Sequence, residues 1–268
     1  MNNPLLSIIT INYNNAEGLR KTLESVRIQD SLDFEHIIID GGSTDSSVQV
    51  IEEYLKDEVY SKHVTFWCSE KDKGIYNAMN KGISHATGKY VYILNSGDWL
   101  IPNVFKIIFS YLQQYQDCIL YGAIDGYNGN DYAGTFSHTA DELNKVMIPH
   151  QGVFIPLSVH KKYGLYDESY KICADREFVF RVKNKGEKFV HIPIIVCNYN
   201  FEGISSKTTK AKNKENFRIS NQFLSKKQIV LSKIRHFIRI FIQLMLPGII
   251  SIPMVSMIRK LKPTSIVE

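Results

Sequence analysis

Two aspartates follow apolar runs that have the composition of buried strands. Asp98 comes after the run at 90–94 and a short hinge at 95–97, and Asp40 ends the run at 36–39. Near-continuous Ile and Val runs are typical of parallel strands buried on both faces, and ligands of open α/β sheets bind beyond the carboxyl ends of such strands. Carboxylates at that edge are suited to holding a divalent cation against a phosphate, which they would otherwise repel. The alternative is that each Asp only caps the helix after its strand.

The predicted elements support this placement. The pattern predicts a β-α-β-α-β-α-β order, which indicates a doubly wound sheet with right-handed crossovers. Ser43 or Thr44 is expected near the N-cap of the second helix. The strands are predicted at 6–11, 36–40, 64–68 and 90–94, and the helices at 16–28, through Val48, Ile51 and Leu55, and through Ile75, Met79 and Ile83.

The second half of the chain has a less regular pattern. We interpret residues 1–100 as a nucleotide-binding half and 101–205 as an acceptor-binding half of one domain, which the chain length permits. Strands are predicted at 119–124, 152–155 and 188–196, a turn at 125–131 and a helix at 175–183.

Composition and cysteine usage indicate a folded protein of a reducing compartment. The 268 residues are 44% hydrophobic and 22% charged, which is ordinary for a soluble domain. The cysteines (Cys68, Cys118, Cys173, Cys197) lie in or beside apolar runs and show no C-x-x-C spacing. This pattern favours reduced, mostly buried thiols in the cytoplasm over a disulfide framework or a zinc site. The N-terminus leads directly into a strand without a basic region, so no secretory signal is predicted.

The C-terminal segment at 206–268 differs in charge from the rest. From residue 205 onward there are 13 Lys and Arg against two acids, whereas the other 204 residues hold 19 Lys and Arg and 25 acids. A basic tail on an acidic body predicts contact with an anionic surface. Nucleic acid is disfavoured as that surface, because the basic residues alternate with aliphatic more than with aromatic side chains.

The same tail has the pattern of a membrane-surface helix. Within 229–246, polar residues recur every three or four positions and leave a broad apolar face. An uncharged stretch at 240–258 approaches the length of a membrane span, but Pro247, Gly248 and Pro253 interrupt it. An interfacial helix pair therefore fits better than a span. The alternative is an amphipathic helix that packs on the domain's own core.

Taken together, these segments resemble the inverting family 2 glycosyltransferases with the GT-A fold. The resemblance covers about residues 5–205 and implies a Rossmann-like α/β fold, with a mostly parallel sheet flanked by helices, followed here by the C-terminal amphipathic helical extension. The blocks at 73–80 and 95–98 are similar to the branch that makes bacterial surface polysaccharides such as colanic acid. The motifs are SIITINYN at 7–14, DGGSTD at 40–45, EKDKGIYNAMNKG at 70–82, LNSGD at 94–98, PHQG at 149–152 and ADREF at 174–178.

The resemblance implies a nucleotide site in the first half. The Thr10 backbone and the Tyr13 ring would line the base pocket. Asp40 would accept a hydrogen bond from the base or ribose, as a carboxylate does well in a dry pocket. Lys71 and Asp72 would lie within reach of the nucleoside.

The resemblance also implies a metal. Asp98 matches the last acid of the family's D-x-D motif, which binds Mg²⁺ or Mn²⁺ on the diphosphate. This sequence departs from the motif, because Asn95 and Gly97 stand where acids are usual. The Asn95 amide can still bond the ribose or a water on the metal, and one or two carboxylates with substrate phosphates suffice for Mg²⁺.

Asp175 matches the family's catalytic acid position and is the candidate general base. Glu177 is the reserve, although its position along the helix should turn it away. The alternative for Asp175 is a first-turn carboxylate that only stabilises the helix dipole. His150 and Gln151 would hold the donor sugar or stabilise the leaving diphosphate, unless His150 is merely a satisfied loop histidine.

The predicted function is transfer of a sugar from a nucleotide-diphosphate sugar, with UDP favoured, to a saccharide hydroxyl with inversion. The acceptor is expected to be lipid-linked, with the enzyme peripheral on the cytoplasmic face of the inner membrane. A dehydrogenase would need G-x-G-x-x-G after the first strand, and a sugar nucleotidyltransferase would need a Gly-rich basic loop there; neither is present. A third alternative is an inactive subunit that only binds a nucleotide sugar. It is supported only by Asn95 and Gly97, which stand where the motif usually has acids.

Overall fold

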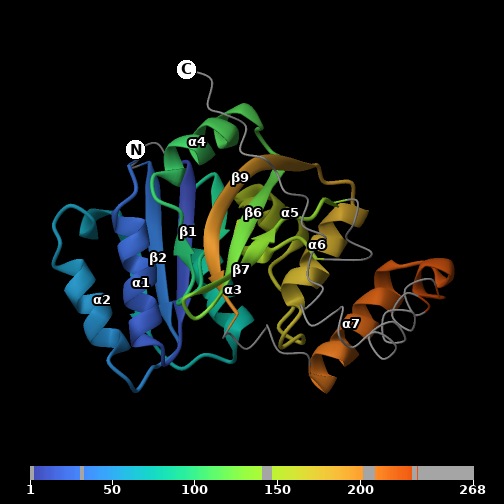
Figure 1. Ribbon diagram of the computed structural model, residues 1–268, viewed down its shortest axis with the longest axis horizontal. Coiled ribbons are helices and arrows are strands. Elements are labelled where there is room, and N and C mark those ends of the chain that lie inside the picture. The colour runs from blue at the N-terminus through green and yellow to red at the C-terminus, as the bar shows by residue number, and fades with distance from the viewer. Residues whose placement is uncertain (1–2, 31–32, 141–146, 202–208, 231–233, 235–268) are drawn as a thin grey trace.

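The computed structural model describes residues 3–30, 33–140, 147–201, 209–230 and 234. Its strands form one mixed sheet in the order β3-β2-β1-β4-β8-β6-β9-β5, and β7 pairs with β6 (Figure 1). The strands are β1 (Leu6–Asn12), β2 (Phe34–Asp40), β3 (Val64–Ser69), β4 (Tyr90–Ile93), β5 (Trp99–Leu100), β6 (Ile119–Asn128), β7 (Asp131–Phe136), β8 (Val153–Pro156) and β9 (Phe189–Asn200). The helices are α1 (Ala16–Arg27), α2 (Ser47–Leu55), α3 (Ile75–His85), α4 (Val104–Gln114), α5 (Leu157–Tyr163), α6 (Ala174–Asn184) and α7 (Lys210–Phe223), with 3₁₀ turns η1 (Ser61–His63) and η3 (His150–Gly152).

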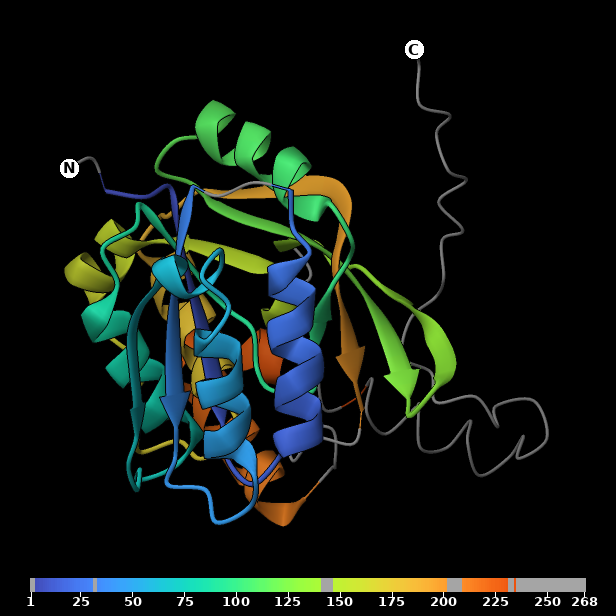
Figure 2. The same cartoon turned by 90° about the vertical axis from the view of Figure 1, so that its left-hand side faces the viewer.

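The first half forms the predicted doubly wound α/β unit. Strands β3, β2, β1 and β4 pair in parallel, and every residue of β1 and β2 is buried. Alternate side chains enter different layers: Ile9 and Ile37 pack in the cluster that holds Met79 of α3, whereas Ile38 packs with Leu19 of α1. Figure 2 shows α1 and α2 side by side on one face of this half. The predicted fold class is confirmed, with both faces of the parallel strands covered.

Two local predictions are wrong. The segment at 125–131 is not a turn, because β6 continues to Asn128 and pairs antiparallel with β7, so that only residues 129 and 130 lie between the strands. The second helix begins at Ser47 with Ser46 as its N-cap, not at Ser43 or Thr44. In both places hydrogen bonds to another part of the chain outweigh the local sequence preference.

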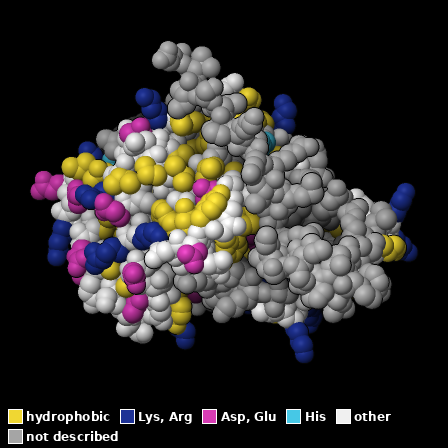
Figure 3. All heavy atoms as spheres, viewed as in Figure 1, with side chains coloured by type: hydrophobic (Ala, Val, Ile, Leu, Met, Phe, Trp, Pro, Cys, Tyr) yellow, Lys and Arg dark blue, Asp and Glu magenta, His cyan; other side chains and the backbone are white. Residues whose placement is uncertain are grey.

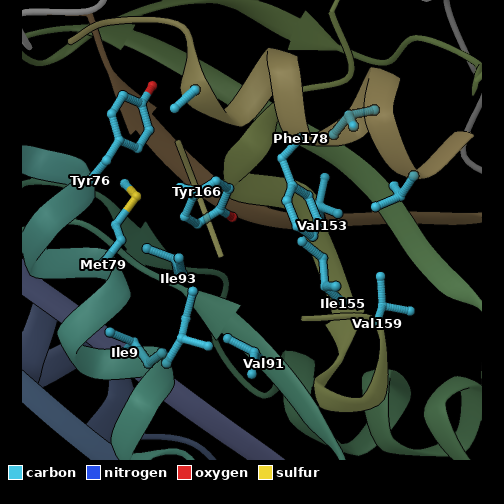
Figure 4. Packing of buried hydrophobic residues seen from close by; sticks show 14 of the residues in the cluster. Ile9, Tyr76, Met79, Val91, Ile93, Val153, Ile155, Val159, Tyr166 and Phe178 are labelled. Carbon is cyan, nitrogen blue, oxygen red and sulfur yellow. The ribbon is translucent and has the colours of Figure 1, made fainter. Parts of the chain in front are cut away.

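The second half brings later segments back to the parallel strands. β8 pairs antiparallel with β4, and β6 pairs with both β8 and β9. The cluster drawn in Figure 4 therefore joins the two halves, with Ile9 and Met79 on one side and Ile155 and Phe178 on the other. The four cysteines are unpaired and three of them are buried, as predicted.

α7 packs against α6. Ile219 of α7 is fully buried, and the ring of Phe223 stacks on that of Phe180 with 5.8 Å between centroids. No helix within the described ranges is long and apolar enough to cross a membrane. The predicted amphipathic segment at 229–246 and the uncharged stretch at 240–258 lie almost entirely outside the described residues.

Charged side chains of both signs mix on the face shown in Figure 3, within its described part. Two of the ion pairs join Arg20 with Glu53 across α1 and α2, and Arg27 with Glu24 within α1. These side chains are substantially exposed, so each pair contributes little to stability.

Candidate active site

Asp40, at the end of β2, is enclosed by its own hydrogen-bond partners. Its carboxylate accepts from Asn12 Nδ2 (2.7 Å), Ser43 Oγ (2.6 Å), Ser43 N (2.9 Å) and Ser69 Oγ (2.6 Å). Burial alone would raise the pKa of Asp40, but these hydrogen bonds outweigh it and hold the pKa below its usual value. A carboxylate has about four acceptor positions, so the predicted contact with a base or ribose would displace one of these donors. In the described structure Asp40 ties together the ends of β1, β2 and β3.

The asparagines after β1 connect the Asp40 loop to the Asp98 loop. Asn14 donates its backbone N–H to Ser43 Oγ (2.8 Å) and accepts from the Thr44 backbone N–H (2.8 Å). On the other side, Asn15 Nδ2 donates to the Ser96 carbonyl oxygen (3.2 Å). Asn14 has φ 48°, a conformation that asparagine tolerates better than most residues. The loops that follow β2 and β4 are therefore tied to the same end of β1, as expected for parallel strands.

Tyr13, Gly41 and Asp72 lie together beside this edge. The Tyr13 ring is 64% exposed. A Cβ on Gly41 would clash with Asp72 Oδ2 and lie 3.3 Å from Tyr13 Cδ2, and one on Gly42 would lie 2.9 Å from the Lys71 backbone nitrogen. The glycines thus let the loops after β2 and β3 approach each other, and this brings the predicted residues Tyr13, Lys71 and Asp72 to one place.

Thr10 contributes no side chain to that surface. It is fully buried, and its hydroxyl lies 2.9 Å from His36 Nε2. Because the Thr10 side chain is buried in the interior, a contact with the base could be made only by the Thr10 backbone, which is the group that the resemblance implies.

Asp98 is buried in the turn after β4 and has few partners. Only 4% of it is exposed, and its Oδ1 accepts from the Asn200 backbone N–H at 3.2 Å. Burial raises the pKa of Asp98 to about 8, and the hydrogen bond from Asn200 opposes this shift only in part. Thr22 Oγ1 donates to the Asp98 carbonyl oxygen (2.7 Å), which fixes the turn to α1.

The Asn95–Asp98 turn fits a hard divalent cation. Asn95 Oδ1 is buried and has no hydrogen-bond partner in the described structure, and the Asp98 backbone N–H donates to the Asn95 carbonyl (3.1 Å). A carboxylate and an unpaired amide oxygen within one turn are the oxygen donors that Mg²⁺ and Mn²⁺ prefer. No group of three or more His, Cys, Asp or Glu able to hold a metal is found within the described ranges.

Asp175 lies in the first turn of α6, in contact with α3. The Tyr76 hydroxyl is 2.9 Å from Asp175 Oδ1 and 2.8 Å from the Ile172 carbonyl oxygen. Burial raises the pKa of Tyr76 well above its usual value, and the Asp175 charge acts in the same direction. The hydroxyl therefore stays protonated and donates. Figure 4 shows Tyr76 and Tyr166 near each other, with 5.7 Å between ring centroids.

η3 is held by hydrogen bonds to two buried tyrosines. His150 Nε2 is 3.2 Å from the Tyr166 hydroxyl; burial lowers the pKa of His150, while the Asp175 charge opposes that shift. The Gln151 carbonyl oxygen accepts from the Tyr92 hydroxyl (2.8 Å), and the Asp98 charge helps to raise the pKa of Tyr92. The structure thus connects His150 with Asp175 electrostatically, and Gln151 with Tyr92 by a hydrogen bond.

Glu177 is turned away from this cluster, as predicted for the reserve base. It is 3% exposed, and its Oε1 accepts from Arg181 Nε at 3.0 Å.

Several residues near the site could not be found from sequence alone. Tyr76 lies within the motif at 70–82, but the motif alone does not indicate a role for its side chain. Glu168 accepts from Asn77 Nδ2 (3.1 Å) and Asn80 Nδ2 (3.0 Å), two amides of the same motif one helical turn apart. Residues three positions apart lie on the same face of a helix, so the spacing of the two asparagines could have indicated that they bind one common residue elsewhere in the fold.

Comparison with known sequences identifies relatives over most of the chain. The model of the glycosyl transferase family 2 matches residues 7–183. An uncharacterized glycosyltransferase of Mycobacterium tuberculosis is 35% identical over 210 residues, which cover 76% of this chain and 78% of the relative. A PGL/p-HBAD biosynthesis glycosyltransferase of Mycobacterium bovis is 28% identical over 209 residues, 76% of this chain and 80% of the relative.

Solved structures share the fold at low sequence identity. S. aureus TarS 1-349 in complex with UDP-GlcNAc matches with a TM-score of 0.66 and 16% identity, over 81% of this chain and 65% of that one. A mannosyltransferase from Pyrobaculum calidifontis in complex with GDP-Man and Mn²⁺ matches with a TM-score of 0.57 and 14% identity, over 74% and 57% of the two chains. This chain spans less than two thirds of either structure.

Proposed function

This chain belongs to glycosyl transferase family 2 and has the GT-A fold, and from this premise we propose that it transfers a sugar from a nucleotide-diphosphate sugar to a saccharide hydroxyl with inversion. The observations that carry the proposal are a buried acid, Asp98, in the turn after β4, and a second acid, Asp175, that accepts from Tyr76 at the start of α6. Asp98 is suited to holding a metal on the diphosphate, and Asp175 is suited to taking the proton of the acceptor hydroxyl. The name of the M. bovis relative, a glycosyltransferase of PGL/p-HBAD biosynthesis, supports a role in assembling surface glycans.

On the acceptor side, Asp175 acts as the general base. The acceptor hydroxyl loses its proton to the carboxylate as its oxygen attacks the anomeric carbon. Because the Tyr76 hydroxyl occupies Oδ1, Oδ2 is the oxygen that takes the proton. A single displacement inverts the configuration, so an α-linked donor gives a β-linked product.

On the donor side, Asp98 and Asn95 would hold Mg²⁺ or Mn²⁺. When bound, the metal supplies positive charge that stabilises the departing diphosphate. The turn contributes one buried carboxylate and one unpaired amide oxygen. The presence of Mn²⁺ in the Pyrobaculum mannosyltransferase complex supports this assignment. In this proposal His150 and Gln151 orient the transferred sugar.

The nucleoside binds at the surface formed by Tyr13, Lys71 and Asp72, with the Asp40 network holding the loops beneath it. Tyr13 offers an exposed ring for stacking, and the Thr10 backbone lies along the strand behind it. UDP is the proposed nucleotide, since TarS was solved with UDP-GlcNAc.

Calorimetry with UDP, GDP and dTDP, each with and without Mn²⁺, tests this site. We expect UDP to bind most tightly, and Tyr13→Ala to weaken binding about 10-fold, in line with roughly 1–3 kcal/mol for one stacked base. Tyr132→Ala is the matched control, because Tyr132 is similarly exposed at 58% but lies on β7. If no nucleoside diphosphate binds, or if the two variants weaken binding equally, the proposed base site is wrong.

The acceptor is proposed to be a lipid-linked saccharide, reached by a protein that is peripheral on the cytoplasmic face of the inner membrane. The support is the basic tail at 206–268, because anionic lipids attract cations at about 1 kcal/mol each near the surface. The polar stripe of residues 229–246 contains several of these cations.

Deletion of residues 229–268 is expected to release the protein from vesicles that contain anionic lipid. The deletion starts beyond α7, which ends at Phe223, so the packing of α7 on α6 is kept. Co-sedimentation with anionic and with zwitterionic vesicles measures the effect. If the shortened protein sediments as strongly as the full chain, the tail is not the membrane contact.

A further inference from the structure

A carboxylate of α7 holds the loop that leads into the Asp175 helix. Glu215 Oε1 accepts the backbone N–H of Lys171 (2.8 Å), and Glu215 Oε2 accepts those of Ile172 (3.0 Å) and Cys173 (2.9 Å). Cys173 is the N-cap of α6, and its own side chain makes no capping hydrogen bond. A residue more than 40 positions away thus fixes the peptides that begin the helix, and Asp175 follows two residues later.

The same loop is held from the opposite side by α3. The Tyr76 hydroxyl lies within hydrogen-bond distance of both the Ile172 carbonyl oxygen and the Asp175 carboxylate. The Ile172 peptide is bound at its N–H by Glu215, and its C=O lies beside the Tyr76 hydroxyl, which shares its single proton between this oxygen and Asp175. Beyond Asp175, Arg176 Nη1 donates to Asn216 Oδ1 (2.9 Å). Contacts from α7 flank Asp175 on both sides in the sequence.

α7 is itself anchored, so that Glu215 has a fixed position. Ile219 is fully buried, the Arg218 guanidinium lies 4.0 Å from the centre of the Tyr170 ring, and Phe223 stacks on Phe180. Hydrogen bonds from backbone N–H groups to a charged carboxylate are among the stronger ones in proteins. A shift of the backbone at the start of α6, which would carry Asp175 with it, would require this anchored set of contacts to break.

We propose that Glu215 is a positioning residue for the general base, and that α7 completes the acceptor side of the active site. The inference rests on the proposed function, because it takes Asp175 as the base. Misplacement of a reacting group by about 1 Å can lower a rate by about 100-fold, and the only role assigned to Glu215 is to prevent such a shift. The nucleotide site, which lies at the loops after β1, β2 and β3, has no direct contact with Glu215 among those described.

The test is Glu215→Gln in the full-length protein. The amide keeps the size of the side chain, but one of its two acceptor oxygens becomes an NH₂ group that faces backbone donors. We expect kcat for sugar transfer to fall about 10- to 100-fold, with an unchanged KM for the donor and an unchanged Kd for UDP. Lys214→Gln, at the neighbouring exposed position of the same helix, is the matched control and should keep the wild-type kcat.

A double variant separates positioning from general stability. Adding Glu215→Gln to Asp175→Asn should lower kcat no further, because two residues that act through one group are not additive. A multiplied loss would overturn the proposal, as would a wild-type kcat in Glu215→Gln or a loss fully accounted for by a smaller folded fraction at the assay temperature. If Asp175→Asn itself is fully active in a protein whose wild type transfers sugar, the proposed base is wrong and the inference fails with it.

Discussion

Asp175→Asn is expected to lower kcat for sugar transfer by about 10²- to 10⁴-fold, the usual contribution of a positioned general base. The amide cannot take the proton of the acceptor hydroxyl, but it can still accept the Tyr76 hydrogen bond seen at 2.9 Å. The fold of the first turn of α6 should therefore be kept. The Kd for UDP should not change, because the proposed nucleotide surface lies on the other half of the domain. Steady-state kinetics with a defined acceptor, together with calorimetry, measures both quantities.

Glu177→Gln provides the comparison for this variant. Glu177 sits in the same first turn of α6, but its carboxylate is bound to Arg181 and is buried. We expect some loss of stability from disrupting a buried ion pair, and little loss of kcat per folded molecule. The reverse result, with an active Asp175→Asn and an inactive but folded Glu177→Gln, would transfer the role of base to Glu177.

Asp98→Asn is expected to lower metal-dependent turnover by about 10²- to 10³-fold, the scale seen when one electrostatic contact to a developing charge is removed. Asparagine has nearly the same volume and can accept the Asn200 backbone N–H that Asp98 accepts now. The substitution removes the only carboxylate of the 95–98 turn, because Asn95 supplies an amide oxygen and no charge. Turnover as a function of Mn²⁺ concentration should show a loss of activity that added metal does not restore.

Asp125→Asn is the matched control for the metal variant. Asp125 lies on β6 and accepts from Thr135 Oγ1, which an asparagine can also do. This variant should keep both the rate and the metal dependence of the wild type. Equal activity of Asp98→Asn and wild type, with or without chelator, would remove the metal from the proposed mechanism.

The sequence was most informative where structure is determined locally. The apolar runs predict β1, β2 and β4, because parallel strands covered on both faces are apolar along nearly their whole length. The β6–β7 hairpin was missed because Asp125, Gly126 and Asn128 have low strand propensity, and pairing with β7 and β9 outweighs it. Local composition carries no information about such partners.

The same limit applies to the candidate site. The sequence indicates the acids Asp40, Asp98 and Asp175 because each lies within a short motif after a strand or at the start of a helix. Tyr76 was not connected to Asp175, since 99 residues separate them. In the sequence, Glu215 is one of two acids in a basic tail, and its three backbone donors become visible only when α7 is placed on α6.

The measurement that tests the central claim most directly is release of nucleoside diphosphate from a panel of nucleotide sugars, with Mn²⁺ or Mg²⁺ and a saccharide acceptor. We predict metal-dependent release from one donor, matched by glycosylated acceptor with the inverted anomeric configuration, and lost in Asp98→Asn. Tight binding of a nucleotide sugar without release or transfer, across the donors and a range of lipid-linked and soluble acceptors, would contradict the account and favour a nucleotide-sugar-binding subunit.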